Sequence, residues 1–399
     1  MGACNHNNPH RAHWTLDPDV VYLNHGSFGA CPKAILNAQS GWRSRMESEP
    51  VRFFVRDLER LLDETRDRLG AFVGADPDDL CLLPNTTAAV NTVFRSLPLA
   101  PGDEILTTDH EYNACNNAIN FVTDRAGARV VTAPIPFPIE SPGQATDAIL
   151  SCVTPRTRYA LIDWITSATA LILPIKEIVD RLRAQGVETF VDAAHAPGMV
   201  EMDINDLGAA FCAGNCHKWM CSPKGSAFLH VRRDLQELIR PLSISHGANT
   251  TRNDRSKFRI EADWTGTNDP TACLTIPTAI DFFDALLDGG WDELRKHNRA
   301  LVLEGRKLLC MALAITPPAP ESMIGSIATV PIRDGTPAAP ARSPLYADPL
   351  QQTLLEDFGV QVPVIPWPAP PRRVLRISAQ LYNTLDQYEI LAAALAKLL

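Results

Sequence analysis

The sequence lacks the features of a membrane protein or a secreted protein. Its longest apolar stretch, residues 159–175, is interrupted by Asp163 and by three hydroxyl side chains, so we expect no membrane span. Residues 1–8 show neither the charged nor the apolar region of a signal peptide, so we expect a cytoplasmic protein. An excess of basic residues is also missing. The 46 acidic and 37 basic side chains give a net charge of −9, which argues against nucleic acid or an anionic membrane as partner.

The ten cysteines show no pattern typical of a metal site. Cys212, Cys216 and Cys221 flank His217, but spacings of four and five residues match no common zinc motif. We interpret these three as buried small hydrophobic side chains. Without a secretory signal, the cysteines as a set are expected to be reduced thiols, and no metal is predicted.

What is present is the pattern of an α/β protein with two domains. A length of 399 residues is more than one ordinary core usually organises. Short apolar runs alternate with helical stretches, which favours a mostly parallel sheet. The runs are 104–108, 128–134, 159–164 and 187–191.

The chain divides into three predicted parts. We expect an arm with little structure of its own over residues 1–20, a large domain over 21–262 and a smaller α+β domain over 263–399. Proline is enriched, at 32 residues, and its clusters predict loops and stiff connections. The clusters lie at 316–320, 337–344 and 363–371.

Lys218 and Asp192 are the most informative pair of residues. Lys218 lies in a tight turn between two apolar runs, 207–213 and 225–231, whereas an isolated lysine would more simply be a surface residue. Asp192 ends a short apolar strand, at the edge where open α/β sheets bind ligands. Together they suit pyridoxal phosphate, because a lysine can form the Schiff base while a carboxylate pairs with the pyridinium nitrogen.

Three segments resemble a known family. Asp192–His195, Gly214–Trp219 and Pro223–Gly225 are similar to the class V aminotransferase family of fold type I pyridoxal phosphate enzymes, and most similar to its isopenicillin N epimerase-like branch. The resemblance covers the chain from about Tyr22 to Leu399. It implies a large domain with a mostly parallel, seven-stranded type of sheet, a smaller C-terminal α+β domain, and a homodimer with shared active sites.

A phosphate site is predicted where an apolar strand, residues 80–83, leads through a polar turn into a helix. Free N–H groups and hydroxyls at a helix N-terminus suit an anion. Asn85 or Thr86 could also serve simply as an N-cap. The resemblance assigns Thr86 and Thr87 to the cofactor phosphate.

The resemblance also implies the remaining cofactor contacts. Asn215 and His217 correspond to phosphate contacts, and His195 to a contact with the oxygen on the cofactor ring. Tyr112, at the end of a strand, corresponds to the residue that stacks on the ring, where many relatives carry histidine. Thr267 corresponds to a residue that reaches the phosphate of a neighbouring subunit.

The substrate is expected to be a small molecule, an amino acid held by its carboxylate. Arginine offers a planar fork that pairs with both carboxylate oxygens, and Arg376 alternates with apolar neighbours on a strand. The resemblance gives Arg376 this role, places Asn24 near the same carboxylate and makes the neighbouring His25 a further substrate-binding residue.

Several reactions are compatible with this site. Lys218 is the natural general base for the Cα proton. Epimerisation would need a second acid, for which Tyr112 and His110 are the candidates. Carbon–sulfur lyase chemistry and transamination remain alternatives. A cysteine desulfurase is disfavoured because Phe358–Pro371 contains no cysteine, and a non-catalytic binding protein is disfavoured because Lys218, Asp192 and Arg376 occur together.

Overall fold

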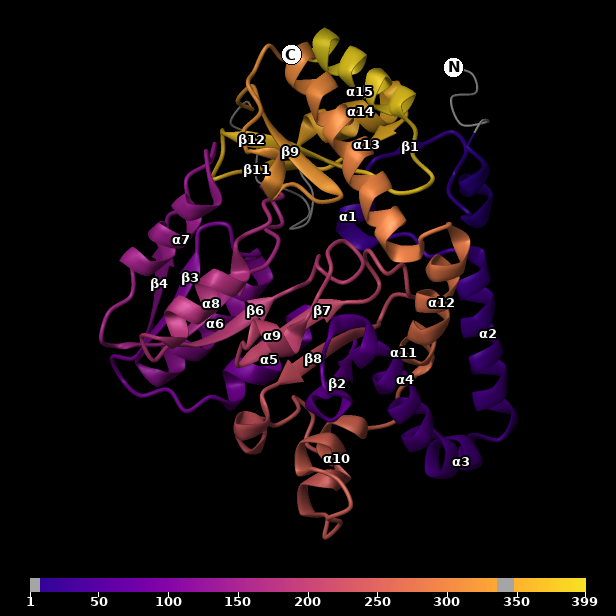
Figure 1. Ribbon diagram of the computed structural model, residues 1–399, viewed down its shortest axis with the longest axis vertical. Coiled ribbons are helices and arrows are strands. Elements are labelled where there is room, and N and C mark those ends of the chain that lie inside the picture. Colours follow the sequence, from indigo (N-terminus) through magenta and orange to yellow (C-terminus); the bar gives the residue numbers. More distant parts are fainter. Residues whose placement is uncertain (1–7, 336–347) are drawn as a thin grey trace.

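In the computed structural model, seven strands of the described chain form one central sheet (Figure 1). The structure describes residues 8–335 and 348–399, so the first seven residues of the predicted arm and the proline cluster at 337–344 lie outside the described residues. The strand order is β2-β8-β7-β6-β5-β3-β4, in which β7, β6, β5, β3 and β4 are parallel and β8 is antiparallel to both of its neighbours, β7 and β2. The bounds are β2 (Leu80–Leu83), β3 (Glu104–Thr108), β4 (Arg129–Ala133), β5 (Thr157–Asp163), β6 (Glu188–Asp192), β7 (Phe211–Asn215) and β8 (Ala227–Val231). The predicted α/β fold with a mostly parallel, seven-stranded sheet is confirmed.

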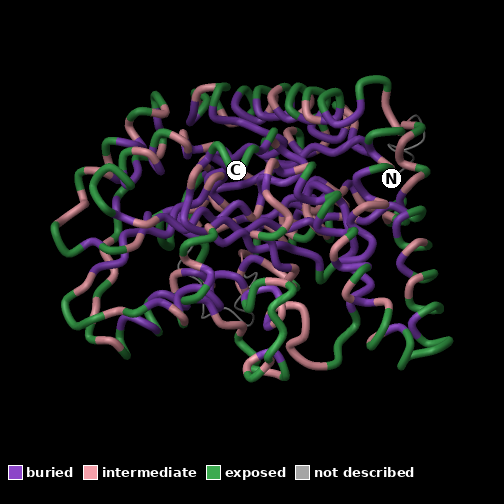
Figure 2. The backbone as a smooth tube through the Cα atoms, turned by 60° about the horizontal axis from the view of Figure 1, so that its bottom comes forward, coloured by how far each residue is buried: buried purple, intermediate pink, exposed green. Residues whose placement is uncertain are grey.

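Helices cover both faces of this sheet. The helices are α5 (Thr86–Ser96), α6 (Asn113–Ala126), α7 (Pro142–Ser151), α8 (Ile175–Arg183) and α9 (Ile204–Leu207). Successive strand residues point to opposite faces, so Leu161 packs with the cluster of α5 and α6 while Ile162 packs with that of α7 and α8. Figure 2 shows the buried segments gathered in the interior and the exposed ones at the periphery. Burial on both faces explains why these strands read as continuous apolar runs.

The C-terminal part builds a smaller α+β unit. In the described residues, β11 (Val364–Pro366), β12 (Arg373–Ser378) and β9 (Ile327–Ile332) form an antiparallel sheet in that order. Its helices are α13 (Gly290–Ala312), α14 (Pro349–Phe358) and α15 (Leu385–Leu398). An N-terminal strand also joins this unit: β1 (Val21–Tyr22) pairs in parallel with β10 (Val360–Gln361).

The remaining helices come from residues 25–73 and 257–286. They are α1 (His25–Phe28), α2 (Lys33–Ser48), α3 (Pro50–Arg52), a π-helical turn (Phe53–Asp57), α4 (Leu58–Val73), α10 (Lys257–Asp263), α11 (Thr271–Leu274) and α12 (Ile276–Leu286). Short 3-10 turns occur at 77–79, 233–238, 246–249 and 321–323. None of the helices in the described residues combines the length and the apolarity needed to cross a membrane.

The N-terminal segment is more ordered than predicted over residues 8–14. Pro9–His13 form a 3-10 helix that Asn8 caps, and the Asn8 side chain donates to the carbonyl of Leu381 at 2.7 Å. Trp14 is buried and donates its indole N–H to the carbonyl of Ala30 at 3.0 Å. Leu381 lies 373 positions from Asn8, so the polar composition of the segment gave no sign of this contact.

Candidate active site

The turn between β7 and β8 carries Lys218, and two glycines let other segments approach it closely. Gly29 and Gly198 have φ angles of +69° and +87°. A Cβ at Gly29 would clash with the carbonyl of His217, and one at Gly198 would lie 2.7 Å from the backbone of Trp219. Only glycine fits these positions without strain, so the backbone around Lys218 is enclosed on two sides.

Lys218 is positioned by a buried histidine. Its Nζ lies 3.1 Å from Nε2 of His195, which follows β6 and is 2% exposed. The indole N–H of Trp219 donates to Nδ1 of the same ring at 3.2 Å. Burial, then the charge of Arg376, lowers the pKa of Lys218 to about 8. The side chain is therefore partly a neutral amine near neutral pH, which is the form that acts as nucleophile or base.

Asp192 ends β6 and is the best hydrogen-bonded member of a buried acidic cluster. Its Oδ1 accepts the N–H of Ala194 at 2.8 Å, and the Cys115 thiol lies 3.4 Å from Oδ2. Glu111 and Asp163 are its neighbours, and one ligand atom each of Glu111, Cys115 and Asp192 lies within 4.8 Å of the others. Burial raises the pKa of all three carboxyls, and the charge of Asp192 adds to the effect on Asp163 and Glu111.

Glu111 and Asp163 were not predicted from the sequence as site residues. Each has one buried carboxyl oxygen, Oε2 of Glu111 and Oδ2 of Asp163, with no hydrogen-bond partner in the described part of the chain. The signal was present for Asp163, an acid at the end of an apolar run beside the Asp192 strand. Among the three acids, Asp192 alone accepts hydrogen bonds from both a backbone N–H and a thiol and also has its pKa lowered by the charge of Lys218. These interactions favour its ionised form, so Asp192 fits a pyridinium nitrogen best.

The N-terminus of α5 lies where the sequence predicts an anion site. Asn85 caps the helix through a 2.8 Å bond from the N–H of Ala88, as the N-cap alternative proposed. Asn215 accepts the N–H of Thr86 at 2.9 Å, so its carbonyl oxygen orders the turn and its NH₂ group is the part left for a phosphate. The Thr86 hydroxyl is buried and has no partner within the described ranges. An orphaned donor at a helix N-terminus fits a phosphate, and Thr87 lies on the same first turn.

His217 reaches this region in a more restricted way than predicted. Its Nδ1 donates to the carbonyl of Ser226 at 3.0 Å, since a carbonyl can only accept. Burial, then the charge of Lys218, lowers the pKa of His217 to about 4. A contact from Nε2 to a phosphate oxygen would therefore require a second proton on this ring.

Tyr112 and His110 differ sharply in their surroundings. Tyr112 stands at the start of α6 and is 43% exposed. His110 is buried, and both its nitrogens have partners: Nε2 donates to the carbonyl of Ile135 at 3.0 Å, and Nδ1 accepts from Thr169 at 2.6 Å. Burial lowers the pKa of His110. The geometry therefore counts against His110 as the second acid and leaves Tyr112.

Arg376 on β12 links the small domain to the large one. Its guanidinium donates to the Ser167 carbonyl at 2.6 Å and to the Ser27 hydroxyl at 2.9 Å. The Ser27 hydroxyl in turn donates to Asn24 at 2.5 Å. Arg376 is 3% exposed, so this charge is held rigidly between the domains. The predicted pair of Arg376 and Asn24 is brought together.

His25 has a different role from the one predicted. Its Nε2 donates to the carbonyl of Lys218 at 3.1 Å, and its Nδ1 accepts from the hydroxyl of Tyr382 at 2.7 Å. The residue is fully buried. With both nitrogens engaged, His25 supports the lysine turn, and the geometry gives it no direct contact to offer a substrate.

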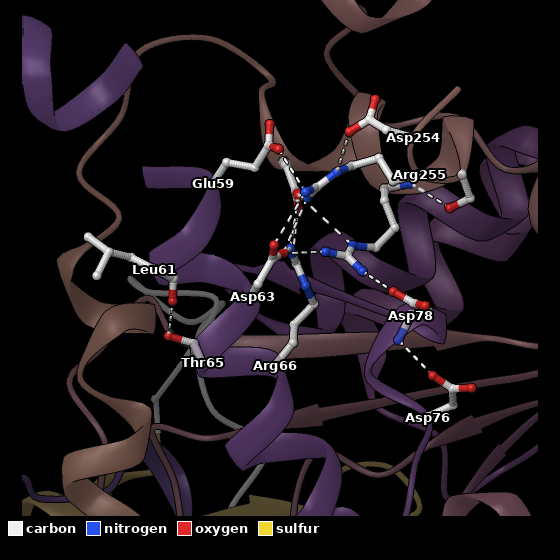
Figure 3. A network of polar contacts seen from close by, with 12 residues as sticks. Glu59, Leu61, Asp63, Thr65, Arg66, Asp76, Asp78, Asp254 and Arg255 are labelled. Carbon is white, nitrogen blue, oxygen red and sulfur yellow. Dashed lines mark hydrogen bonds and ion pairs between the residues drawn. The ribbon is translucent and has the colours of Figure 1, made fainter. Parts of the chain in front are cut away.

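Thr267 lies exposed in the loop that follows α10. That loop is anchored by buried ion pairs between α4 and the 252–263 segment, and Figure 3 shows Arg66, Asp63 and Arg255 converging there. Arg66 is fully buried and makes two bonds, of 2.6 and 3.0 Å, to Asp263. The start of the loop is therefore held in place by these ion pairs. That Thr267 reaches the phosphate of a neighbouring subunit stays a prediction.

The chain is similar to several known proteins over most of its length. The family model described as Aminotransferase class-V matches residues 22–339. The isopenicillin N epimerase of Streptomyces clavuligerus is 34% identical, covering 96% of this chain and 96% of its own. The putative L-cysteine desulfhydrase 2 of Oryza sativa subsp. japonica is 33% identical, covering 96% of this chain and 85% of its own. A solved complex of the cystine C-S lyase C-DES with cysteine persulfide has a TM-score of 0.76 at 21% identity, covering 98% of this chain and 99% of that one, which shows the shared fold.

Proposed function

Because this chain belongs to the class-V aminotransferase family, we propose that it is an amino acid epimerase that removes and returns the proton at the α-carbon. It is a pyridoxal phosphate-dependent enzyme of that family. The observation that carries the proposal is that Lys218 and Arg376 lie close enough, at the junction of the two domains, for the charge of Arg376 to lower the pKa of Lys218. One supplies a base of lowered pKa and the other a buried cation for a carboxylate.

The residues present fit the cofactor. When bound, pyridoxal phosphate supplies an electron-withdrawing ring that stabilises negative charge at the α-carbon. Lys218 would hold it covalently, Asp192 would face the ring nitrogen, and the Thr86 hydroxyl with the N-terminus of α5 would face the phosphate. The buried Thr86 hydroxyl has no hydrogen-bond partner within the described residues, so it could donate to a phosphate oxygen.

Arg376 orients the substrate. Its guanidinium donates to Ser167 and Ser27, and the arriving carboxylate would take over one or both of these bonds. A bidentate pair fixes both position and rotation of the amino acid. The α-proton can then be directed at Nζ of Lys218, which accepts it as a neutral amine.

Inversion requires a proton from the opposite side, and we assign that role to Tyr112. It is the candidate acid whose side chain is not sealed in the core, since both nitrogens of His110 are engaged. Two isopenicillin N epimerases, 34% and 33% identical, match this chain over 96% of both lengths, which supports inversion over the other outcomes.

A carbon–sulfur lyase is the second candidate. It needs only one base, so Lys218 alone would serve, with the sulfur group leaving from the β-carbon. Two putative L-cysteine desulfhydrases of Oryza sativa subsp. japonica, 33% and 32% identical, support this alternative.

Proton NMR in heavy water separates the two. The cofactor-loaded protein is incubated with isopenicillin N, with a panel of L-amino acids and with L-cysteine. We expect deuterium at Cα together with the inverted product. Pyruvate with released sulfide and no inversion would overturn the proposal in favour of the lyase.

Matched variants test the assignment of the two proton carriers. Tyr112→Phe should abolish inversion but keep deuterium exchange for the enantiomer whose proton faces Lys218. Lys218→Ala should abolish both. If Tyr112→Phe inverts its substrate at the normal rate, the second acid lies elsewhere.

We also propose that two copies assemble with Thr267 of each chain reaching the phosphate of the other. Its exposure on an anchored loop supports this arrangement. Mixing Lys218→Ala with Thr267→Val gives a direct check. Heterodimers should contain one intact site and recover part of the activity that each variant lacks alone, whereas independent sites would show no recovery.

A further inference from the structure

Three buried side chains stand in a hydrogen-bonded line at the base of the site. The indole N–H of Trp219 points at Nδ1 of His195, 3.2 Å away, and Nε2 of the same ring lies 3.1 Å from Nζ of Lys218. Trp219 and His195 are 1% and 2% exposed, so water does not take the place of these partners. The order of donors along this line can be worked out from chemistry alone.

An indole nitrogen can only donate, so Nδ1 of His195 must be the acceptor. A neutral imidazole that accepts at Nδ1 carries its hydrogen on Nε2. That hydrogen points at Lys218, so Nζ must accept it. An ammonium group has three hydrogens and no acceptor, and therefore cannot fill this place.

The charged alternatives leave hydrogens facing each other. A protonated His195 would direct an Nδ1–H against the indole N–H of Trp219. A protonated Lys218 would direct its hydrogens against the Nε2–H of His195. Only a neutral imidazole next to a neutral amine satisfies both contacts, and a buried donor that is left without an acceptor destabilises the arrangement.

We propose that Trp219 is a positioning residue which, through the tautomer of His195, holds Lys218 as a neutral amine. The inference deepens the proposed function, since a neutral Lys218 is the form that captures the cofactor and later accepts the α-proton. Trp219 touches neither cofactor nor substrate in this role and acts through His195.

The surroundings hold Trp219 in place. His25 packs against its ring at a centroid distance of 4.8 Å and donates to the carbonyl of Lys218. Gly198 allows the backbone to approach that of Trp219. The groups whose charges act on Lys218 are Arg376, which lowers its pKa, and Asp192, Cys115 and Asp163, which raise it. Burial lowers the pKa of His195 well below its usual range, in keeping with a neutral ring.

The decisive measurement uses the cofactor-free full-length protein. The rate at which trinitrobenzenesulfonate labels Lys218 is followed against pH by peptide mass spectrometry. Trp219 is replaced by 3-benzothienylalanine, which keeps the ring shape but has sulfur in place of the N–H. Freed of its donor, Nδ1 can take the hydrogen and Nε2 can accept from an ammonium. We expect the midpoint of the curve of Lys218 labelling rate against pH to move upward by on the order of one pH unit.

Two controls keep the outcome interpretable. Trp291→Phe loses a comparable buried indole bond, 3.1 Å to the carbonyl of Ile280, and should leave the midpoint unchanged. Nitrogen-15 NMR of histidine-labelled protein, assigned with His195→Gln, should show hydrogen on Nε2 of His195 in the unmodified chain. Hydrogen on Nδ1, or an unmoved midpoint in the folded benzothienyl variant, would overturn the proposal. Neither readout uses substrate, so both are independent of whether the enzyme proves to be an epimerase or a lyase.

Discussion

Replacing Arg376 with glutamine should raise the pKa of Lys218 in the cofactor-free protein. After burial, the positive charge of Arg376 is the largest cause that lowers this pKa from the ordinary 10.5 to about 8. Removing that charge while keeping a polar side chain relieves repulsion of the ammonium form. The same arginine is predicted to hold the substrate carboxylate, so the measurement is made without substrate.

The size of the effect follows from the order of causes. Burial outweighs Arg376, so loss of the arginine should raise the pKa of Lys218 by on the order of one pH unit. At pH 8 the neutral fraction of Lys218 would then fall from about one half to about one tenth. The labelling rate at that pH should fall about fivefold, while the limiting rate at high pH stays the same.

The assay is the pH profile of Lys218 labelling by trinitrobenzenesulfonate, read on the peptide that carries it. Arg373→Gln is the matched control: it removes an arginine from the same strand, but one that pairs with Asp348 at 2.6 Å. Asp192→Asn should shift the profile the other way, since Asp192 raises the pKa of Lys218. Identical profiles for Arg376→Gln and the unmodified chain would refute the electrostatic argument.

Three further predictions concern stability and cofactor binding. Hydrogen bonds from two threonines and two arginines lower the pKa of Glu104 to about 2 from 4.5, even though its burial works in the opposite direction. This stabilisation is present above pH 4.5 and lost toward pH 2. Between pH 4.5 and pH 2, urea unfolding should show that the free energy of unfolding falls by about 1–2 kcal/mol more in the unmodified chain than in Glu104→Gln. This figure allows for the solvent screening of the half-exposed arginines. Arg66→Met should destabilise the fold by about 3 kcal/mol with little dependence on salt, because Arg66 is fully buried against Asp263. Thr86→Val should weaken cofactor binding by about 10-fold or more in an absorbance titration, whereas Thr86→Ser should retain it.

The residues that sequence reasoning identified are those whose role depends on local structure. Asp192 ends one apolar strand and Lys218 lies in the turn after another, and the end of a parallel strand is a defined place in an α/β sheet. The helix N-terminus at Thr86 is another local feature. Arg376 was identified through a family resemblance, and the alternation of its strand with apolar residues was consistent with that role.

The residues that were missed or misassigned depend on contacts between distant segments. His25 is engaged by Tyr382, which lies 357 positions away, and His110 is engaged by Thr169 in the turn that follows β5. No short pattern reveals that a histidine already has two partners. The burial of Trp14 under the C-terminal unit was hidden for the same reason.

The placement of acids along the central sheet accounts for both the stability of the fold and the location of its chemistry. At the N-terminal ends of the parallel strands, Glu104 and Glu188 each form ion pairs with arginines. At the opposite edge, where β5 and β6 end, Asp163 and Asp192 lie next to Glu111 with no arginine among their hydrogen-bond partners in the described chain, and Lys218 is the cation that faces them. Buried carboxyls without a matching cation are costly unless they are protonated or meet an arriving positive charge. If Asp192 faces a cationic cofactor ring, as proposed above, that cost would be removed, and cofactor binding should stabilise the C-terminal ends of these strands more than their N-terminal ends. Hydrogen exchange of the strands with and without cofactor would show protection gained at 161–163 and 190–192 and little change at 104–106. Uniform protection along the strands would contradict this division of roles.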